Sequence, residues 1–375
     1  MRIVVVGGGP AGLYFSLLMK RRDPRHELVI LERDGRNDTF GWGIVFSDQT
    51  FGYLHDNDAP SAAAFTDEWE TWDNVDVVHR GKRISIRGNR FSGIGRLAFL
   101  QILRNRCEAL GVEQRFHTNV TDLSTLGEYD LLVGSDGANS LVRQRFADAF
   151  QPAIDIRSNK YIWLGTHQLF HGLTLTFRQN DDGVFAAHSY KFNKTTSTFI
   201  VECPAATWAR AGFATMSEQE TCGYLERLFA DDLVGHPLMT NNFVRWLNFP
   251  LVKNRCWHHD AVVLLGDALH TAHFSIGSGT KLALEDAIAL AHAFDGHPDV
   301  RAALEAFTAV RKPVVDSLQA AAFESLLRFE QMEDDMQLDP VSFAYQLMTR
   351  SGRIDREKLR KRDPEFVAAY ERTLQ

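Results

Sequence analysis

The pattern of apolar and polar positions divides the chain into blocks of different secondary structure. Up to about residue 155, short apolar runs alternate with stretches of helical periodicity, as is typical of an α/β layer. The same alternation returns at about residue 256 and continues to about residue 330. We therefore expect one discontinuous α/β domain made of residues 1–155 and 256–330.

The segment between these two parts has a different pattern. Residues 156–255 contain β-branched and aromatic runs that are separated by turn residues, namely Tyr161–Gly165, Leu173–Phe177 and Thr198–Glu202. Such runs predict a mostly antiparallel β-sheet, here inserted into the α/β domain as a substrate-binding domain. Residues 331–375 are expected to form a helical C-terminal tail. Clefts between such domains are preferred ligand sites.

Composition and charge exclude several classes of function. The 375 residues are 45% hydrophobic and 24% charged, which suits a folded protein with a full core, and the net charge of −7 argues against a nucleic-acid partner. No apolar run approaches the roughly 20 residues that cross a bilayer. The four cysteines form neither a C-x-x-C pair nor a zinc pattern, so we expect a cytoplasmic protein without a metal site.

The N-terminal glycines form a dinucleotide-binding motif. The run Gly7-Gly8-Gly9-Pro10-Ala11-Gly12 follows the apolar strand Ile3–Val6 and opens a helix. Gly7 allows the tight turn, Gly9 lets the backbone approach a diphosphate, and Gly12 permits close packing of helix on strand. These glycines could also make a tight turn and nothing more, but the strand and the helix stand in the order that the motif requires.

An acidic residue stands at the expected distance from this motif. The strand Glu27–Leu31 is followed by Glu32, 20 residues after Gly12, and then by Arg33. A carboxylate in that place accepts hydrogen bonds from ribose hydroxyls. Glu32 and Arg33 are therefore assigned to the cofactor site.

Two more strands end in an acidic residue next to a glycine. The first ends at Asp136-Gly137, and the second at Gly266-Asp267, which is followed by Gly277-Ser278-Gly279-Thr280 and a helix. Both carboxylates would lie at the carboxyl edge of the sheet, where they can hold ribose or ribityl hydroxyls. The helix after Gly279 can direct its N-terminus at the same ligand.

With these motifs, nearly the whole chain resembles the class A flavin monooxygenases, the para-hydroxybenzoate hydroxylase superfamily. The resemblance includes Arg96, which opens the helical run Arg96–Leu100. It implies a Rossmann-like domain with non-covalent FAD, in which Arg96 contacts the diphosphate, Asp267 contacts the ribityl chain, and Asp136 belongs to a motif for FAD and nicotinamide. The full set of expected cofactor residues is Gly7, Gly9, Pro10, Ala11, Gly12, Glu32, Arg33, Arg96, Asp136, Asp267, Gly277, Gly279 and Thr280.

Some segments are similar to particular branches of this superfamily. Asp38–Asp48, His273–Asp286 and Leu347–Ser351 resemble salicyloyl-CoA 5-hydroxylases and the flavin domain of anthraniloyl-CoA monooxygenases. Asn159–Trp163 and Ser197–Cys203 are also similar to a hydroxylase of violacein biosynthesis. The chain departs from the wider superfamily at His273-Phe274, where a proline pair is usual, and at Lys281, where asparagine is usual.

The chemistry follows from the resemblance. Only one dinucleotide motif is present, so NADH or NADPH is expected to bind transiently. In the superfamily the pyridine nucleotide reduces FAD, oxygen adds at flavin C4a, and the hydroperoxide delivers an electrophilic oxygen to an electron-rich ring. The protein positions the substrate, excludes water and promotes phenolate character.

Four residues are candidates for assisting proton removal from the substrate. His188 and Tyr190 share one face of a strand because side chains alternate, and His270 and His273 follow the Gly266-Asp267 motif. A histidine can share a proton near neutral pH. For any one of the four residues, an ordinary core or surface side chain is the more common outcome.

A basic segment near the C-terminus has two interpretations. It contains Arg350, Arg353, Arg356, Lys358, Arg360, Lys361 and Arg362. Such a run is usually a solvated helix face, but guanidinium groups also pair well with phosphates, so Arg350 and Arg353 could hold the phosphates of CoA.

The resemblance leaves three functions open. The first is hydroxylation of an aromatic acyl-CoA, with salicyloyl-CoA converted to gentisyl-CoA by NAD(P)H and O2. The second is hydroxylation of a tryptophan- or indole-derived metabolite. The third is a protein that binds FAD without hydroxylating anything. The preferred nucleotide, the hydroxylated ring position and the oligomeric state stay undetermined by the sequence.

Overall fold

A six-stranded, mainly parallel sheet carries the N-terminal glycine motif. The computed structural model describes residues 1–241, 244–297 and 299–375, and only the backbone of Asp48 and Gln49. The strand order is β14-β15-β7-β1-β2-β6, and all neighbours are parallel except β14 and β15. The strands span β1 Arg2–Val6, β2 Glu27–Leu31, β6 Glu113–Arg115, β7 Leu131–Gly134, β14 His258–His259 and β15 Val262–Leu264.

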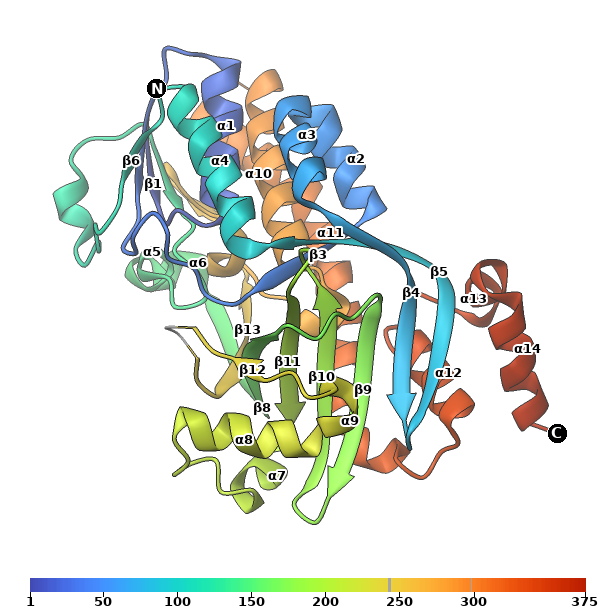
Figure 1. The fold of residues 1–375 in the computed structure, drawn as a ribbon. Coiled ribbons are helices and arrows are strands. Elements are labelled where there is room, and N and C mark those ends of the chain that lie inside the picture. Colours follow the sequence, from blue (N-terminus) through green and yellow to red (C-terminus); the bar gives the residue numbers. More distant parts are fainter. Residues whose placement is uncertain (242–243, 298) are drawn as a thin grey trace.

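The central strands of this sheet are apolar because helices cover them. Ile3, Val4, Val5 and Val6 are all buried in β1, as expected for a parallel strand without a solvated face. Helix α1 (Pro10–Arg22) contacts α4 (Arg96–Ala109) and α10 (Gly279–Gly296), and Figure 1 shows the three helices together in the upper part of the molecule. The predicted α/β layer is therefore confirmed.

The larger sheet follows the order β12-β8-β11-β10-β9-β4-β5-β3, and β13 also pairs with β8. It is antiparallel except between β4 and β9. Its strands are β3 Gly43–Ser47, β4 Glu70–His79, β5 Lys82–Gly95, β8 Pro152–Thr166, β9 Leu173–Asn180, β10 Gly183–Lys191, β11 Ser197–Cys203, β12 Leu238–Met239 and β13 Leu247–Asn254. The mostly antiparallel sheet expected within 156–255 is present.

This sheet extends beyond the segment expected to form it. Strands β3, β4 and β5 come from residues 43–95, which the sequence pattern assigned to the α/β domain. Val75 and Val77 of β4 and Ile86 of β5 have inward-facing apolar side chains, and they are buried beside Leu175 of β9. The parallel pairing of Val77 with Leu175 joins the two parts, and this long-range contact has no local sequence signal.

Helices connect the two sheets and cover the edge of the larger one. Helix α11 (Val300–Glu330) extends from the core of the first sheet at Phe307 to the core of the second at Phe329. The helical tail expected for 331–375 is confirmed as α12 (Pro340–Thr349), α13 (Arg356–Arg362) and α14 (Pro364–Thr373). Helices α12 and α13 pack on β4 and β5, and α14 packs on α12 and α13, at the right of Figure 1.

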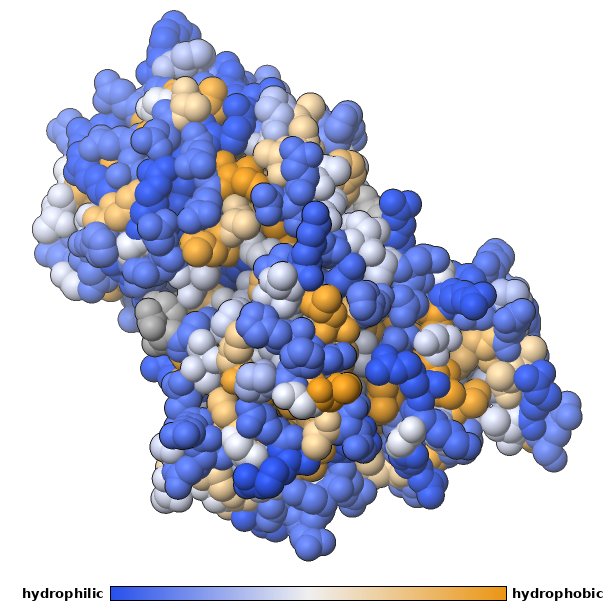
Figure 2. Space-filling model, in the orientation of Figure 1, coloured by the Kyte–Doolittle hydropathy of each residue, from blue (hydrophilic) through white to orange (hydrophobic). Residues whose placement is uncertain are grey.

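The remaining elements are short or lie at the periphery. They are α2 Asp48–Asn57, α3 Ala59–Glu68, α5 Leu141–Arg145, α6 Ala147–Phe150, α7 Ala205–Arg210, α8 Glu218–Leu228 and α9 Ala230–Leu233, with 3-10 turns η1 Leu123–Leu126, η2 Gly266–Ala268, η3 Phe274–Ile276 and η4 Met332–Asp335. On the face drawn in Figure 2, hydrophilic residues cover most of the surface and apolar ones are scattered among them. No helix within the described residues is both long and apolar enough to cross a membrane.

Candidate active site

The carboxyl edge of the six-stranded sheet brings the three strand-end motifs together. The turn after β1 is tied to β2 by the hydrogen bond from Gly7 N to Leu31 O (2.9 Å). The turn after β7 is tied to β1 by Ser135 N to Val6 O (2.8 Å), and the end of β15 to β7 by Leu265 N to Gly134 O (2.9 Å). Because parallel strands end on the same side, the motifs form one continuous rim.

The glycine turn leaves open space in which a ligand could approach the protein backbone closely. Gly7 has φ +103°, and a Cβ there would lie 2.3 Å from Ser135 O. A Cβ on Gly12 would lie 2.3 Å from Gly7 O, whereas one on Gly9 meets nothing within 4 Å. Helix α1 starts at Pro10, and no side chain caps it. Its first N–H groups can therefore bind an anion such as a diphosphate.

Glu32 faces this turn directly. Its Oε2 accepts a hydrogen bond from Gly8 N (2.6 Å), and its Oε1 accepts one from Asp34 N (2.9 Å). The carboxylate is thus held at the end of β2 beside the glycines. The neighbouring Arg33 is exposed, and its Nε lies 3.5 Å from Asp34 Oδ2.

Arg96 and Asp267 add charges to the rim. Arg96 begins α4, and its Nε is buried without a hydrogen-bond partner among the described residues. Burial lowers the pKa of Arg96, while the charge of Asp267 opposes that shift. Asp267 is exposed, but enough protein surrounds its carboxylate to raise its pKa. A half-buried cation whose buried Nε has no hydrogen-bond partner favours an anionic ligand at this place.

Asp136 is engaged on one side only. Its Oδ2 accepts hydrogen bonds from Leu141 N (2.6 Å) and Val142 N (3.2 Å), and so caps α5. Its Oδ1 is buried, and no donor reaches it within the described part of the chain. The neighbouring Arg143 donates to Ala268 O (2.9 Å), which links this turn to the Gly266-Asp267 motif.

The N-terminus of α10 forms the opposite wall. Gly277 has φ +62°, and a Cβ on Gly279 would meet nothing within 4 Å. The side chain of the N-cap Ser278 donates to Ile276 O (3.2 Å) and does not cap the helix, so the N–H groups at Gly279 and Thr280 lie at an open helix end. The open glycines, the unpaired Arg96 Nε and the orphan Asp136 Oδ1 together fit a dinucleotide.

A buried cluster of two histidines and a glutamate lies on the side of the larger sheet. His188 of β10 places Nε2 3.4 Å from Glu202 Oε2, and His273 places Nε2 3.7 Å from Glu202 Oε1. The exposed fractions are 4%, 1% and 2% for His188, Glu202 and His273. Asn159 Nδ2 donates to Glu202 Oε1 (2.9 Å). We call His188, Glu202 and His273 the histidine–glutamate cluster.

The cluster holds a negative charge beside a neutral imidazole. Burial alone would raise the pKa of Glu202, but His273, His188 and the amide of Asn159 hold that pKa below its usual value. Burial lowers the pKa of His273 to about 4, although the charge of Glu202 opposes this shift. At neutral pH, therefore, His273 can accept a proton next to a carboxylate that stabilises the imidazolium.

Comparisons with known proteins agree with this geometry. A family model described as an FAD binding domain matches residues 124–322. Salicyloyl-CoA 5-hydroxylase from a Streptomyces species is 42% identical over 98% of this chain and 72% of that protein. Protodeoxyviolaceinate monooxygenase from Chromobacterium violaceum is 34% identical over 92% of both chains. The chain belongs to the FAD-dependent aromatic monooxygenases.

Solved structures give the same fold for this FAD-dependent monooxygenase. The tetrameric form of 2-methyl-3-hydroxypyridine-5-carboxylic acid oxygenase matches 96% of this chain and 97% of its own with a TM-score of 0.74 at 20% identity. A probable FAD-dependent monooxygenase of Pseudomonas aeruginosa matches 90% and 99% with a TM-score of 0.69. FAD is the cofactor and NAD(P)H the typical reductant of the family, so the alternative of a protein that only binds FAD is set aside.

The structure separates the four catalytic candidates. It brings His188 and His273 together through Glu202. Tyr190 instead donates its hydroxyl to Gly43 O (2.8 Å) and stacks on Trp72, and burial raises its pKa. It therefore supports strand β3 beside Arg96.

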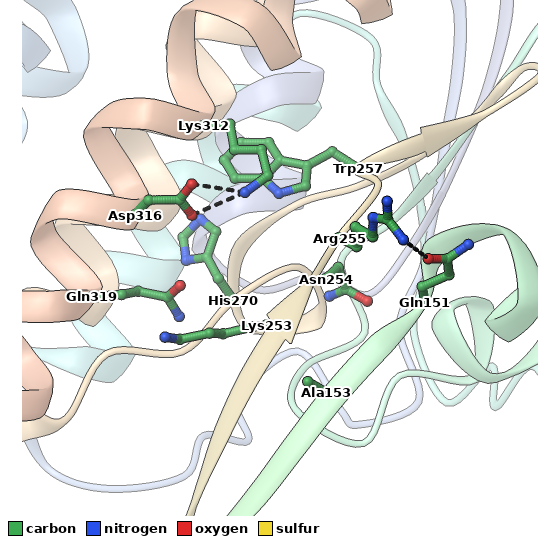
Figure 3. Close-up of a pocket in the computed structure, with 10 residues that line it drawn as sticks. All are labelled: Gln151, Ala153, Lys253, Asn254, Arg255, Trp257, His270, Lys312, Asp316 and Gln319. Atoms are coloured by element: carbon green, nitrogen blue, oxygen red, sulfur yellow. Dashed lines mark hydrogen bonds and ion pairs between the residues drawn. The ribbon is translucent and has the colours of Figure 1, made fainter.

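His270 faces a different part of the monooxygenase. Its Nε2 lies 2.8 Å from Asp286 Oδ2, and Asp286 Oδ1 accepts a hydrogen bond from Arg311 Nε (2.8 Å). His270 also lines a cavity of about 230 Å³ beside Trp257 and Lys312, and no member of the histidine–glutamate cluster lines that cavity (Figure 3). His270 thus packs against α10 and α11 instead of joining the cluster.

One residue of the basic C-terminal segment, Arg350, already has its hydrogen-bond partners inside the protein. Arg350 points inward: its Nε donates to Ser325 Oγ (2.7 Å) and one terminal nitrogen donates to Ser275 O (2.6 Å). The half-buried guanidinium of Arg350 already donates to protein acceptors, which argues against the expectation that it pairs with CoA phosphates. Arg353 is exposed.

Sequence reasoning missed Glu202 and Arg143. Glu202 is the penultimate residue of β11, whose seven residues are all buried, so an acidic residue within a run of apolar and small side chains was the available signal. Arg143 lies six residues after Gly137, in helix α5, and its exposed fraction is 1%. Within residues 1–241, 244–297 and 299–375, no group of three or more acidic, histidine or cysteine side chains is arranged to hold a metal ion.

Two glycine variants should separate folding from cofactor binding. Gly12→Ala is expected to lower the free energy of unfolding by about 1–3 kcal/mol, because its Cβ would overlap the carbonyl oxygen of Gly7. Gly9→Ala should leave the Tm of the apoprotein unchanged and weaken FAD binding by on the order of 10-fold, since its Cβ projects only into the open space. Thermal melts and flavin titrations measure both. Equal FAD affinity in Gly9→Ala and the wild type would place the diphosphate elsewhere.

Proposed function

We propose that this monooxygenase hydroxylates an aromatic acyl-CoA, with salicyloyl-CoA as the favoured substrate and gentisyl-CoA as the product. The proposed hydroxylation chemistry is supported by the buried histidine–glutamate cluster, which lies between the larger sheet and the turn before α10. The choice of thioester is supported by the relative named salicyloyl-CoA 5-hydroxylase, which is 42% identical over 98% of the chain.

The residues of the rim would hold FAD in a defined orientation. Gly9 and the start of α1 would receive the diphosphate together with Arg96. Glu32 would accept hydrogen bonds from the ribose, and Asp267 from the ribityl chain. When bound and reduced, FAD would supply the electrons that activate O2, and one oxygen atom of O2 would enter the ring.

The histidine–glutamate cluster would make the substrate ring electron-rich. The hydroxyl of salicylate can pass its proton to Ser275 Oγ, whose own proton would move to Nδ1 of His273, an imidazole that is neutral at pH 7. Glu202, beside Nε2, stabilises the resulting positive charge. A phenolate concentrates electron density at the ring carbon opposite its oxygen, which is position 5 of the salicyl group. Burial of the cluster excludes water, which strengthens each of these electrostatic interactions.

The CoA part would supply binding energy away from the ring. Several of the basic side chains in the tail already have partners: Arg360 pairs with Glu371, and Arg362 donates to Asn89 Oδ1. Arg353 is exposed, and its guanidinium has no ion-pair partner in the described ranges, so it is the residue proposed to meet a CoA phosphate.

Turnover of the thioester and of the free acid tests the proposal. The phosphate contact of Arg353, at about 1.5–3 kcal/mol, should raise kcat/KM for salicyloyl-CoA at least about 10-fold above that for salicylate. The measurement is substrate-stimulated NAD(P)H oxidation, with isotope-labelled O2 traced into the product. The ratio of kcat/KM between salicyloyl-CoA and salicylate should fall as added salt screens the phosphate contact. Arg353→Glu should raise KM for the thioester and leave KM for salicylate unchanged.

The same assay decides between substrate classes. Equal turnover of salicylate and its thioester would refute the CoA proposal. An indole-derived substrate is supported by the 34% identity to protodeoxyviolaceinate monooxygenase over 92% of both chains, and stimulation by tryptophan-derived compounds alone would establish it. Oxygen label entering the product from water would refute hydroxylation by O2 altogether.

A further inference from the structure

Arg350 connects the C-terminal helices to the turn in front of α10. We propose that Arg350 is a positioning residue of the active site, which fixes the tautomer of His273 and holds the turn η3 in place. It acts through Ser325 of α11 and Ser275 of η3. The proposal concerns residues of this chain and does not depend on which aromatic substrate is hydroxylated.

A directed series of hydrogen bonds starts at Arg350. A guanidinium can only donate, so Ser325 Oγ accepts from Arg350 Nε at 2.7 Å. Ser325 and Ser275 share a hydrogen bond of 2.8 Å, and Ser275 Oγ lies 2.8 Å from His273 Nδ1. The backbone N–H of Ser275 also donates to His273 Nδ1 (3.4 Å), so this nitrogen is an acceptor.

The direction of these bonds determines the position of the imidazole proton. Since His273 Nδ1 accepts, Ser275 Oγ donates to it, and Ser325 Oγ in turn donates to Ser275. A neutral His273 then carries its proton on Nε2, the nitrogen that lies 3.7 Å from Glu202 Oε1. The proton therefore faces the carboxylate, and the imidazole is oriented for the cluster.

Arg350 also holds the backbone of the turn. A terminal nitrogen donates to Ser275 O (2.6 Å), another donates to Leu347 O, and the guanidinium lies 5.6 Å from the ring centroid of Phe329. Burial lowers the pKa of Arg350 to about 10, so it stays charged at neutral pH. Within the described part of the chain, its cation is met by carbonyl groups, a hydroxyl and a ring, without an ion-pair partner.

Turn η3, which Arg350 holds, is followed directly by residues that are proposed to contact the flavin. Turn η3 ends at Ile276, its C-cap Gly277 has φ +62°, and α10 starts at Gly279. A shift of Ser275 would therefore move the open helix end that faces the cofactor. For this reason a residue 75 positions away from Ser275 is expected to influence FAD affinity.

Substitution of Arg350 tests both parts of the proposal, the tautomer of His273 and the position of turn η3. In ¹⁵N-histidine spectra of the apoprotein, wild-type His273 should appear as the Nε2–H tautomer, assigned by the loss of its signal in His273→Asn. Arg350→Gln should give a mixture of tautomers and raise the Kd for FAD about 10-fold, because a charge-assisted hydrogen bond to the turn is lost. The matched control Arg372→Gln, an exposed change on α14 of the same C-terminal tail, should change neither.

A second variant separates the two links and remains informative if Arg350→Gln does not fold. Ser325→Ala removes the hydroxyl between Arg350 and Ser275 but keeps the bond from Arg350 to Ser275 O. It should therefore disturb the tautomer of His273 and leave FAD affinity within about 2-fold of the wild type. An Nδ1–H tautomer in the wild type, or a single unchanged tautomer in Ser325→Ala, would overturn the proposed relay. Unchanged FAD affinity in Arg350→Gln would refute the proposal that Arg350 holds turn η3 in place.

Discussion

Replacing Glu202 by glutamine is expected to lower the kcat for hydroxylation about 100-fold while the variant retains its FAD, because general acid–base groups typically contribute 100-fold or more. Glutamine preserves the shape and still accepts from Asn159 Nδ2, but it removes the charge next to both imidazoles. The proton of the substrate hydroxyl is then accepted less readily. Product formation under saturating substrate and the flavin content of the purified variant give the two readouts.

The pH profile distinguishes proton acceptance from a packing role. The charge of Glu202 raises the pKa of His273 against the burial that lowers it to about 4. Without that charge the pKa of His273 falls further, so the acid limb of the kcat profile should move to lower pH. Glu357→Gln, an exposed change on α13, serves as the control. A uniform loss of kcat with an unmoved acid limb would assign Glu202 to structure alone.

Replacing Arg96 by glutamine is expected to raise the Kd for FAD about 10- to 100-fold, since a hydrogen bond between charged groups contributes about 1.5–3 kcal/mol. The guanidinium Nε is buried without a hydrogen bond, so its removal should leave the Tm of the apoprotein unchanged or slightly higher. Opposite effects on affinity and stability would identify a ligand-binding residue. Fluorescence quenching of FAD and thermal melts of the apoprotein provide the measurements.

The control for Arg96 lies on the adjacent strand. Arg87 of β5 is exposed, and Arg87→Gln should change neither the Kd for FAD nor the Tm. If Arg96→Gln binds FAD as tightly as the wild type, the diphosphate does not meet Arg96, and the orphan Nε needs another explanation. A lowered apoprotein Tm with unchanged affinity would show that Arg96 serves the fold.

The amino-acid sequence by itself determined the cofactor half of this protein. The glycine motif from Gly7 to Gly12, Glu32 and the Gly266-Asp267 motif are local features, each contained in one strand and the turn after it. A buried parallel strand can be recognised in the sequence as a short apolar run. Its carboxyl end lies at the same edge of the sheet as the carboxyl ends of the other parallel strands. The rim of the sheet could therefore be predicted without knowledge of long-range contacts.

Only the tertiary structure decided how the catalytic half is assembled. Glu202 reaches His188 because β10 and β11 pair with Ala186 opposite Glu202, and it reaches His273 across the boundary between the two sheets. Neither distance follows from local periodicity. Strand pairing sets the register, and the burial of both imidazoles around one carboxylate requires the whole core to be folded.

The same reason accounts for the residues that lie elsewhere than expected. His270 and His273 are three residues apart, yet one is held by Asp286 of α10 and the other faces Glu202, because the intervening turn directs them to opposite sides. Arg350 stands in a basic run that is typical of a solvated surface, but α12 docks on β4 and β5 and carries it inward to Ser275. Local sequence specifies strand ends and turns, whereas the partners of a buried charge are chosen by the packing of distant segments.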